Sequence, residues 1–207
     1  MVTLAKTVPD TEDIIAALSK ELCDTYYCNF SVFQSIPDSW AVGQLFPIMP
    51  IHRLQEEPTR QATLADLTCD SDGVIEKFID TESGEPKETV KMHDFTEGNP
   101  YYLGIFLTGA YQEILGDLHN LFGDTDAVHI SLNNAGYTID HYVPGDTVTE
   151  VLSYVQYGRS EMVDNVRQAT EESIQKGSIT KQEAKLLIKH YEEGLSGYTY
   201  LEEAEEL

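Results

Sequence analysis

The spacing of apolar residues divides the chain into three stretches of different character. Near the amino terminus Ile14, Leu18 and Leu22 recur every four residues after the capping pair Asp10-Thr11, a pattern that predicts an opening helix. From Tyr26 onward, short runs rich in β-branched and aromatic residues alternate with Pro, Gly, Asp and Asn, as is typical of strands joined by turns. The predicted strands cover residues 29–34, 46–54, 63–68, 74–79, 101–108, 127–132, 137–143 and 148–156.

One amphipathic helix interrupts this β region, and helices dominate the end of the chain. Apolar residues from Ile114 to Phe122 follow a helical period and stop at Gly123. A further helix is expected from Ser160 to Gly177. Thr180-Lys181-Gln182-Glu183 then forms a capping box for a last helix that ends near Gly194.

These elements predict a mainly β fold with added helices. We expect an antiparallel β-barrel or sandwich with one embedded helix, an amino-terminal helix and a carboxy-terminal helical hairpin. The expected domains are an amino-terminal helical segment over residues 1–25, a β domain over 26–158 that carries a half-site, and a helical subdomain over 159–207.

Composition narrows the class of partner. The chain has 207 residues with 36 acids and 13 bases, a formal net charge of −23 that disfavours nucleic-acid binding and attracts cations. It contains no apolar run of about 18 residues that would predict a membrane span. Three cysteines without a C-x-x-C pair suit a reducing, cytoplasmic environment, and the histidines have no zinc-site spacing, so no metal site is expected.

The segment Cys69-Asp70-Ser71-Asp72-Gly73 places a thiol beside carboxylates after a predicted strand. It has two interpretations. Cys69 is either a small buried residue before a hairpin turn, or an accessible proton donor beside acids that pair with a substrate cation. Neighbouring negative charge disfavours a thiolate, which suits a proton donor better than a nucleophile.

Tyr111 precedes the embedded helix in the segment Gly109-Ala110-Tyr111-Gln112. Small residues before it let the backbone approach another group closely, and its hydroxyl could donate a hydrogen bond to a phosphate. The alternative is an ordinary core tyrosine.

A longer succession of segments resembles the carboxy-terminal region of biosynthetic arginine decarboxylases, which depend on pyridoxal phosphate. The resemblance runs from about Tyr27 to the final helices. Its clearest segments are Pro47-Ile48-Met49-Pro50-Ile51-His52-Arg53-Leu54, Leu64-Ala65-Asp66-Leu67-Thr68-Cys69-Asp70-Ser71-Asp72-Gly73 and Leu107-Thr108-Gly109-Ala110-Tyr111-Gln112-Glu113-Ile114-Leu115.

The resemblance implies a role for several residues. Cys69 matches the cysteine that returns a proton to the substrate after CO2 leaves, and Asp70 matches the acid facing the cationic end of the substrate. Asp72 is expected to support substrate binding, Asp38 is a further possible cation contact, and Tyr111 matches the tyrosine that binds the cofactor phosphate.

The same resemblance implies a missing part. In that family the cofactor lysine and most cofactor contacts belong to a TIM-type barrel, and no lysine here has a recognisable cofactor-lysine context. We therefore expect a fragment or a separately encoded half that is inactive alone. It would need a barrel domain or second subunit and arginine as substrate, with magnesium as a further candidate cofactor, in a homo-oligomeric enzyme of polyamine and spermidine synthesis.

A non-catalytic alternative stays open. The chain could be an oligomerisation or regulatory module that pairs with a full-length decarboxylase. Either interpretation predicts exposed apolar surface where a barrel would pack, expected among Phe30, Phe33, Trp40, Phe46 and Ile48.

Overall fold

The computed structural model describes residues 22–80, 83–116 and 118–202. The predicted amino-terminal helix, with Ile14 and Leu18, lies outside these residues. The chain folds as two compact units, Met1–Gly116 and Asp117–Leu207, which are described separately below. The boundary between the units lies inside the predicted β domain, and the three-part division stays a prediction.

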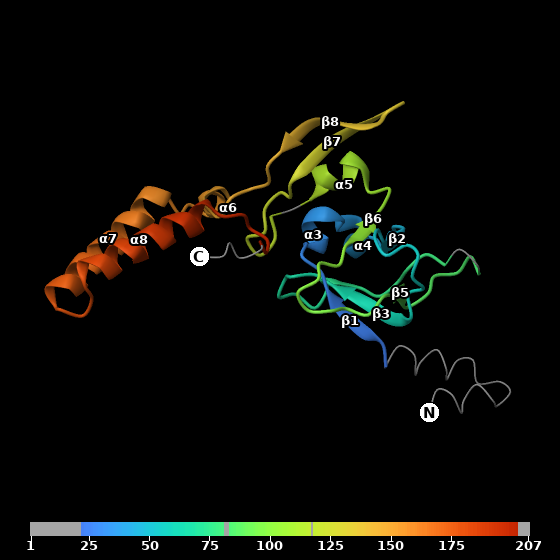
Figure 1. Ribbon diagram of the computed structural model, residues 1–207, viewed down its shortest axis with the longest axis horizontal. Helices are drawn as coiled ribbons and strands as arrows, with labels where there is room; N and C mark the ends of the chain where they lie inside the picture. Colours follow the sequence, from blue (N-terminus) through green and yellow to red (C-terminus); the bar gives the residue numbers. More distant parts are fainter. Residues whose placement is uncertain (1–21, 81–82, 117, 203–207) are drawn as a thin grey trace. The chain divides into compact units, whose positions relative to one another are not determined.

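The first unit is built around strand β3 (Arg60–Ala65), whose last four residues are buried (Figure 1). Strand β1 (Asp24–Tyr27) pairs with it in parallel, while β4 (Val74–Ile75) and β5 (Val90–Met92) pair with it antiparallel. β3 therefore has neighbours on both edges and is the most enclosed strand of this sheet.

A second, two-stranded sheet joins β2 (Ile48–Pro50) to β6 (Leu103–Ile105) antiparallel. The predicted strands at 46–54 and 101–108 contain these strands but are longer than them. The same holds for the predicted strand at 74–79.

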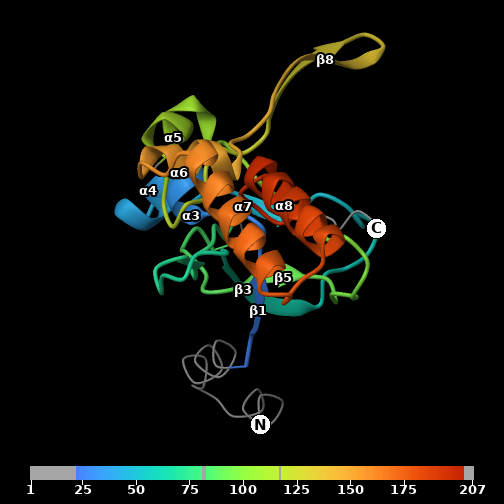
Figure 2. The same cartoon turned by 90° about the vertical axis from the view of Figure 1, so that its left-hand side faces the viewer.

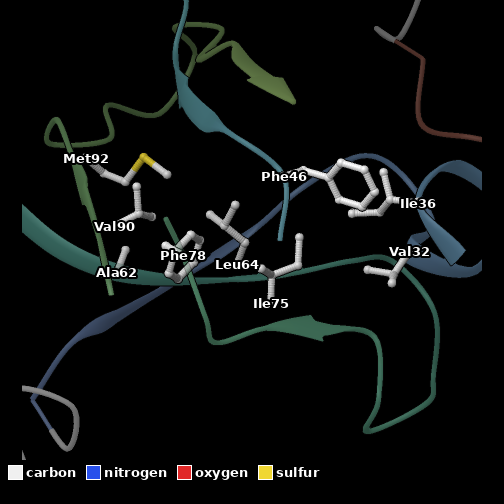
Figure 3. Packing of buried hydrophobic residues seen from close by; sticks show 9 residues of the cluster. All are labelled: Val32, Ile36, Phe46, Ala62, Leu64, Ile75, Phe78, Val90 and Met92. Carbon is white, nitrogen blue, oxygen red and sulfur yellow. The ribbon is translucent and has the colours of Figure 1, made fainter. Parts of the chain in front are cut away.

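The core of the first unit packs side chains of β3, β4 and β5 together with those of helix α3 (Val32–Ser35), and Figure 3 shows this cluster. Leu64 of β3 and Ile36, which follows α3, are each 1% exposed. The remaining members of this cluster are Val32, Phe46, Ala62, Ile75, Phe78, Val90 and Met92. Burial of such aliphatic and aromatic side chains stabilises the fold by roughly 1.5–3 kcal/mol each.

Helix α3 corrects the predicted strand at 29–34. The Ser31 side chain accepts a hydrogen bond from the Gln34 backbone N–H at 3.3 Å, which caps the helix. Val32 and Ile36 are four residues apart and both buried, so they share one helical face. The apolar and β-branched residues of this run favour a strand locally, but the serine cap and the packing of this face favour a helix.

Two more helices complete the described part of the first unit: α4 (Pro37–Ala41) and α5 (Gly109–Leu115). The predicted embedded helix extended to Phe122, but α5 ends before Gly116. An ideal Cβ at Gly116 would lie 2.3 Å from the Gln34 backbone oxygen, so the end of α5 approaches α3 too closely for any larger residue.

The second unit begins with a two-stranded ribbon, β7 (Ala127–Asn133) and β8 (Gly136–Val143), which confirms both predicted strands closely. It continues with helices α6 (Val148–Tyr154), α7 (Arg159–Gln175) and α8 (Lys181–Ser196). Figure 2 shows α7 and α8 lying side by side, as the predicted helical hairpin requires.

Helix α6 corrects the predicted strand at 148–156. Thr147 accepts a hydrogen bond from the Glu150 N–H, and the Glu150 carboxylate accepts one from the Thr147 N–H at 2.8 Å. This capping box starts a helix despite the valines that follow it. The equivalent box at Thr180 and Glu183 was predicted and is confirmed.

The mainly β fold with helices is broadly confirmed, but a barrel or sandwich is not. Within 22–80, 83–116 and 118–202 the strands form three separate sheets, none of them a closed barrel. The same part of the chain contains no helix long and apolar enough to cross a membrane.

Candidate functional site

The Cys69 segment is a loop held at its base by a buried carboxylate, Asp66, which is 3% exposed. Asp66 Oδ2 accepts a hydrogen bond from the Val32 N–H at 2.8 Å, and Oδ1 accepts two from the N–H and hydroxyl of Thr68, each at 2.8 Å. Both oxygens are therefore engaged. The carboxylate ties the end of β3 to the start of α3.

Gly73 closes the other side of this loop. Its carbonyl accepts a hydrogen bond from the Asp66 N–H at 2.8 Å, and its N–H donates to the Asp70 carbonyl at 3.1 Å. An ideal Cβ at Gly73 would lie 2.2 Å from Asp66 Oδ1, so only glycine fits here. The loop is thus narrow at its base.

The tip of the loop carries the predicted chemistry. Cys69, Asp70, Ser71 and Asp72 are all exposed. The structure therefore agrees with a strand end followed by a tight turn, but not with a buried thiol at Cys69. Cys28, by contrast, is partly buried, and this burial raises the pKa of its thiol to about 11.

Tyr111 lies in the first turn of α5, and its side chain is 66% exposed. Two residues in the left-handed region precede it: Leu107 with φ 62° and Gly109 with φ 66°. Glycine adopts such a φ without strain, whereas leucine rarely does. The turn directs the chain into α5 with the tyrosine on an outer face, so Tyr111 is not a core residue.

The next residue, Gln112, faces inward and is 4% exposed. Its Nε2 donates to Asp38 Oδ2 at 2.8 Å, and its Oε1 accepts from the Asp38 backbone N–H at 3.1 Å. Asp38, predicted as a cation contact, is therefore hydrogen-bonded to α5 from the first turn of α4. Its contact with a substrate stays a prediction.

Trp40, on the same helix as Asp38, reaches the Cys69 loop. Its indole Nε1 donates to Asp72 Oδ2 at 3.3 Å, and its ring packs edge-on against Phe33 at 5.2 Å between centroids. Helix α4 thus contacts both segments that carry predicted site residues.

A surface cavity of about 380 Å³ adjoins this contact. Trp40 and Asp72 lie on its wall, together with Glu76 and Lys77. Cys69, Asp70 and Tyr111 do not line it. The structure therefore groups Asp72 with Trp40 at the cavity and connects Asp38 to the helix of Tyr111, while Cys69 and Asp70 stand on the loop tip.

Sequence reasoning missed Asp66 and Gln112 as residues of this site. Asp66-Leu67-Thr68 has the form of an Asx turn, a local signal that identifies a carboxylate bonded to its own backbone. Gln112 gives no comparable signal, because its partner is 74 positions away in the sequence.

The groups that could hold a cofactor or metal are few. Among the described residues, no cluster of three or more histidine, cysteine or acidic side chains could bind a metal ion. Tyr111 is 66% exposed, and a Cβ added at nearby Gly109 would meet no atom within 4 Å, so the described residues do not block a phosphate group here; its contact with Tyr111 stays a prediction.

Comparisons with known proteins show which family this chain resembles. Residues 148–201 match the family model of the arginine decarboxylase C-terminal helical extension. The biosynthetic arginine decarboxylase of Gloeobacter violaceus is 54% identical over 97% of this chain, and that of Nostoc sp. is 56% identical over 91%. The chain spans only 32% and 28% of these two relatives.

A solved structure shows the same likeness. The crystal structure of the biosynthetic arginine decarboxylase from Campylobacter jejuni matches 86% of this chain with a TM-score of 0.75 and 36% identity, over 29% of its own length. The resemblance inferred from the sequence is confirmed. The chain is similar to the carboxy-terminal region of the biosynthetic arginine decarboxylases over most of its length.

Proposed function

We propose that this chain supplies half of the active site of an arginine decarboxylase that converts L-arginine to agmatine and CO2, in cytoplasmic polyamine synthesis. Cys69 is the proton donor, Asp70 binds the cationic end of the substrate, and Asp72 supports it. One observation carries this proposal: the thiol and its neighbouring acids are exposed together on a loop whose base is fixed by the buried Asp66.

The chemistry asked of these residues is simple. Carboxylates of Asp70 and Asp72 attract a guanidinium group by charge and by paired hydrogen bonds. When CO2 leaves, the electron pair of the broken bond remains on the substrate carbon. The Cys69 thiol gives its proton to that carbon and is left as a thiolate, so charge and atoms balance.

A further domain is required. Pyridoxal phosphate supplies the electron sink for the decarboxylation when bound, and we expect a barrel domain or a second subunit to hold most of it. From this chain Tyr111 would donate a hydrogen bond to its phosphate. We propose that the chain alone is inactive and that the assembled enzyme is a homo-oligomer; magnesium is an optional addition to the assay.

Complementation tests the proposal. The chain is mixed with the barrel domain of a biosynthetic arginine decarboxylase and pyridoxal phosphate, and CO2 release from labelled arginine is measured. We expect release only from the mixture, and a loss of about 100-fold or more for Cys69→Ala, the usual scale for a lost acid catalyst. Cys28→Ala is the matched thiol control and should retain activity.

Either of two results would contradict the proposal. Either no barrel partner supports CO2 release with the wild-type chain, or Cys69→Ala releases CO2 as fast as the wild type. If the chain nevertheless binds a full-length decarboxylase in a sizing experiment, the non-catalytic module becomes the better description.

A further inference from the structure

Helix α4 contacts both the Cys69 loop, through Trp40, and helix α5, through Asp38. This suggests a role for Asp38 other than substrate binding. We infer that Asp38 is a positioning residue that, through Gln112, holds α5 and therefore Tyr111 in place. The inference rests on the proposed function for the role of Tyr111, but its structural part does not.

Helix α5 depends on tertiary contacts for its stability. It is seven residues long, and within the described residues no side chain caps its amino end at Thr108. Helices of this length are unstable without tertiary contacts. Its apolar residues contribute little burial, because Ile114 is 81% exposed and Leu115 is 42% exposed.

Two contacts anchor α5 to the helices before it. Gly116 lies against the backbone of α3 at its carboxyl end. Gln112 forms the paired hydrogen bonds with Asp38, donating from its amide nitrogen and accepting at its amide oxygen. Because Gln112 is 4% exposed, water cannot readily replace these bonds, and their loss leaves buried polar groups without partners.

The hydrogen bonds of this pair can be disrupted and then restored by exchanging amide and carboxylate groups between positions 38 and 112. Asp38 offers a carboxylate and a backbone N–H, and an amide at position 112 matches both. A carboxylate at position 112 would still accept from the N–H but would face the Asp38 carboxylate. An asparagine at position 38 would relieve that repulsion, because its amide nitrogen can donate to the new carboxylate.

Four variants separate positioning from a direct cation contact. Asp38→Asn keeps an oxygen that accepts from Gln112 but has no charge, whereas Asp38→Ala removes the acceptor. Gln112→Glu creates the repulsion, and the double variant Asp38→Asn with Gln112→Glu removes it. Positioning predicts that α5 keeps its wild-type stability in Asp38→Asn and in the double variant, and that it loses stability in Asp38→Ala and in Gln112→Glu.

Hydrogen exchange of the isolated chain is the first measurement. The Gly116 N–H, which donates to the Gln112 carbonyl at 2.9 Å, reports on the integrity of α5. We expect it to exchange about tenfold faster in Asp38→Ala and in Gln112→Glu, the scale of one lost buried hydrogen bond, and at nearly the wild-type rate in the other two. Equal exchange in all variants overturns the inference.

The second measurement uses the chain assembled with a cofactor-binding barrel. Because we propose that Tyr111 binds the phosphate, Asp38→Ala and Gln112→Glu should weaken the apparent pyridoxal phosphate affinity about tenfold. Arginine KM should change by less than about twofold. If Asp38 instead binds the substrate cation, Asp38→Asn raises arginine KM and the double variant does not restore it, which overturns the inference. If wild-type mixtures release no CO2, the proposed function fails, whereas the exchange data still decide whether Asp38 holds α5.

Discussion

At the scale of single residues, chemistry and support are divided between exposed and buried side chains. Cys69, Asp70 and Tyr111 are exposed, whereas Asp66 and Gln112, which hold their segments, are almost fully buried. This division is physically reasonable, because reactive groups must meet a substrate and the groups that orient them must not move.

Asp66→Asn tests the support of the Cys69 loop. Donors approach both Asp66 oxygens, so an asparagine must turn its amide N–H₂ toward one set of them and leave those groups without a hydrogen bond. We expect a loss of about 1–3 kcal/mol in the free energy of unfolding, measured by urea denaturation. Glu97→Gln, on an exposed residue, is the control, and equal stability of the two variants would contradict the assigned role.

At the scale of elements, helix caps explain both a correct and a wrong prediction from the sequence. The capping box at Thr180 is easily recognised because no competing strand pattern surrounds it. The box at Thr147 is obscured because valines and threonines nearby favour a strand, yet the same reciprocal hydrogen bonds start α6. Where a cap and a weak strand pattern compete in this chain, the cap is the better guide.

The cap of α8 should make the helix sensitive to acid. Hydrogen bonds from the backbone and side chain of Thr180 lower the pKa of Glu183. A lowered folded-state pKa means that the stabilisation is present above the unfolded value and is lost as pH falls through the folded value. We therefore expect helical ellipticity at 222 nm to fall below about pH 4.5, the region of an ordinary glutamate.

Variants separate this cap from general acid effects. Glu183→Gln cannot be protonated in this range and should show a weaker acid response, whereas Glu171→Gln on the exposed surface of α7 should behave like the wild type. An unchanged acid transition in Glu183→Gln would show that the cap does not contribute to it.

At the scale of the whole molecule, the two features that bear on association and stability are the net charge and the exposed apolar surface. Of the apolar residues expected to lie exposed, Trp40 is 54% exposed, but Phe33 and Phe46 are buried in the first unit. Exposed apolar surface instead includes Leu107 and Ile114 near Tyr111. The exposed apolar residues are therefore only in part those expected from the sequence. That they form a surface for a partner stays a prediction.

The net charge of −23 should make stability depend on salt. Raising NaCl from about 10 mM to about 1 M shortens the Debye length from about 30 Å to about 3 Å, which screens repulsion among the excess acids. We expect the urea midpoint to rise over this range. The double variant Glu97→Lys and Glu171→Lys should respond less, and a midpoint that is independent of salt would contradict the expectation.

The sequence alone determined the features that depend on a few neighbouring residues. The ribbon of β7 and β8, the α7–α8 hairpin with its Thr180 cap, the turn after Cys69 and the family resemblance all follow from local patterns of residues. The structural elements among these are recognisable because capping hydrogen bonds and the alternation of strand faces act over two to four positions, whereas the resemblance is carried by a succession of segments.

Only the tertiary structure decided which distant residues support the site. Asp66 meets Val32 across 34 positions, and Gln112 meets Asp38 across 74. Neither pairing has a periodic signature, because one joins the end of β3 to the start of α3 and the other joins α5 to α4, and these segments are far apart in the sequence. Tertiary burial of Val32 and Ile36, together with the Ser31 cap, makes α3 a helix where a strand was predicted, and the close approach of Gly116 to the backbone of α3 likewise joins segments that are distant in the sequence.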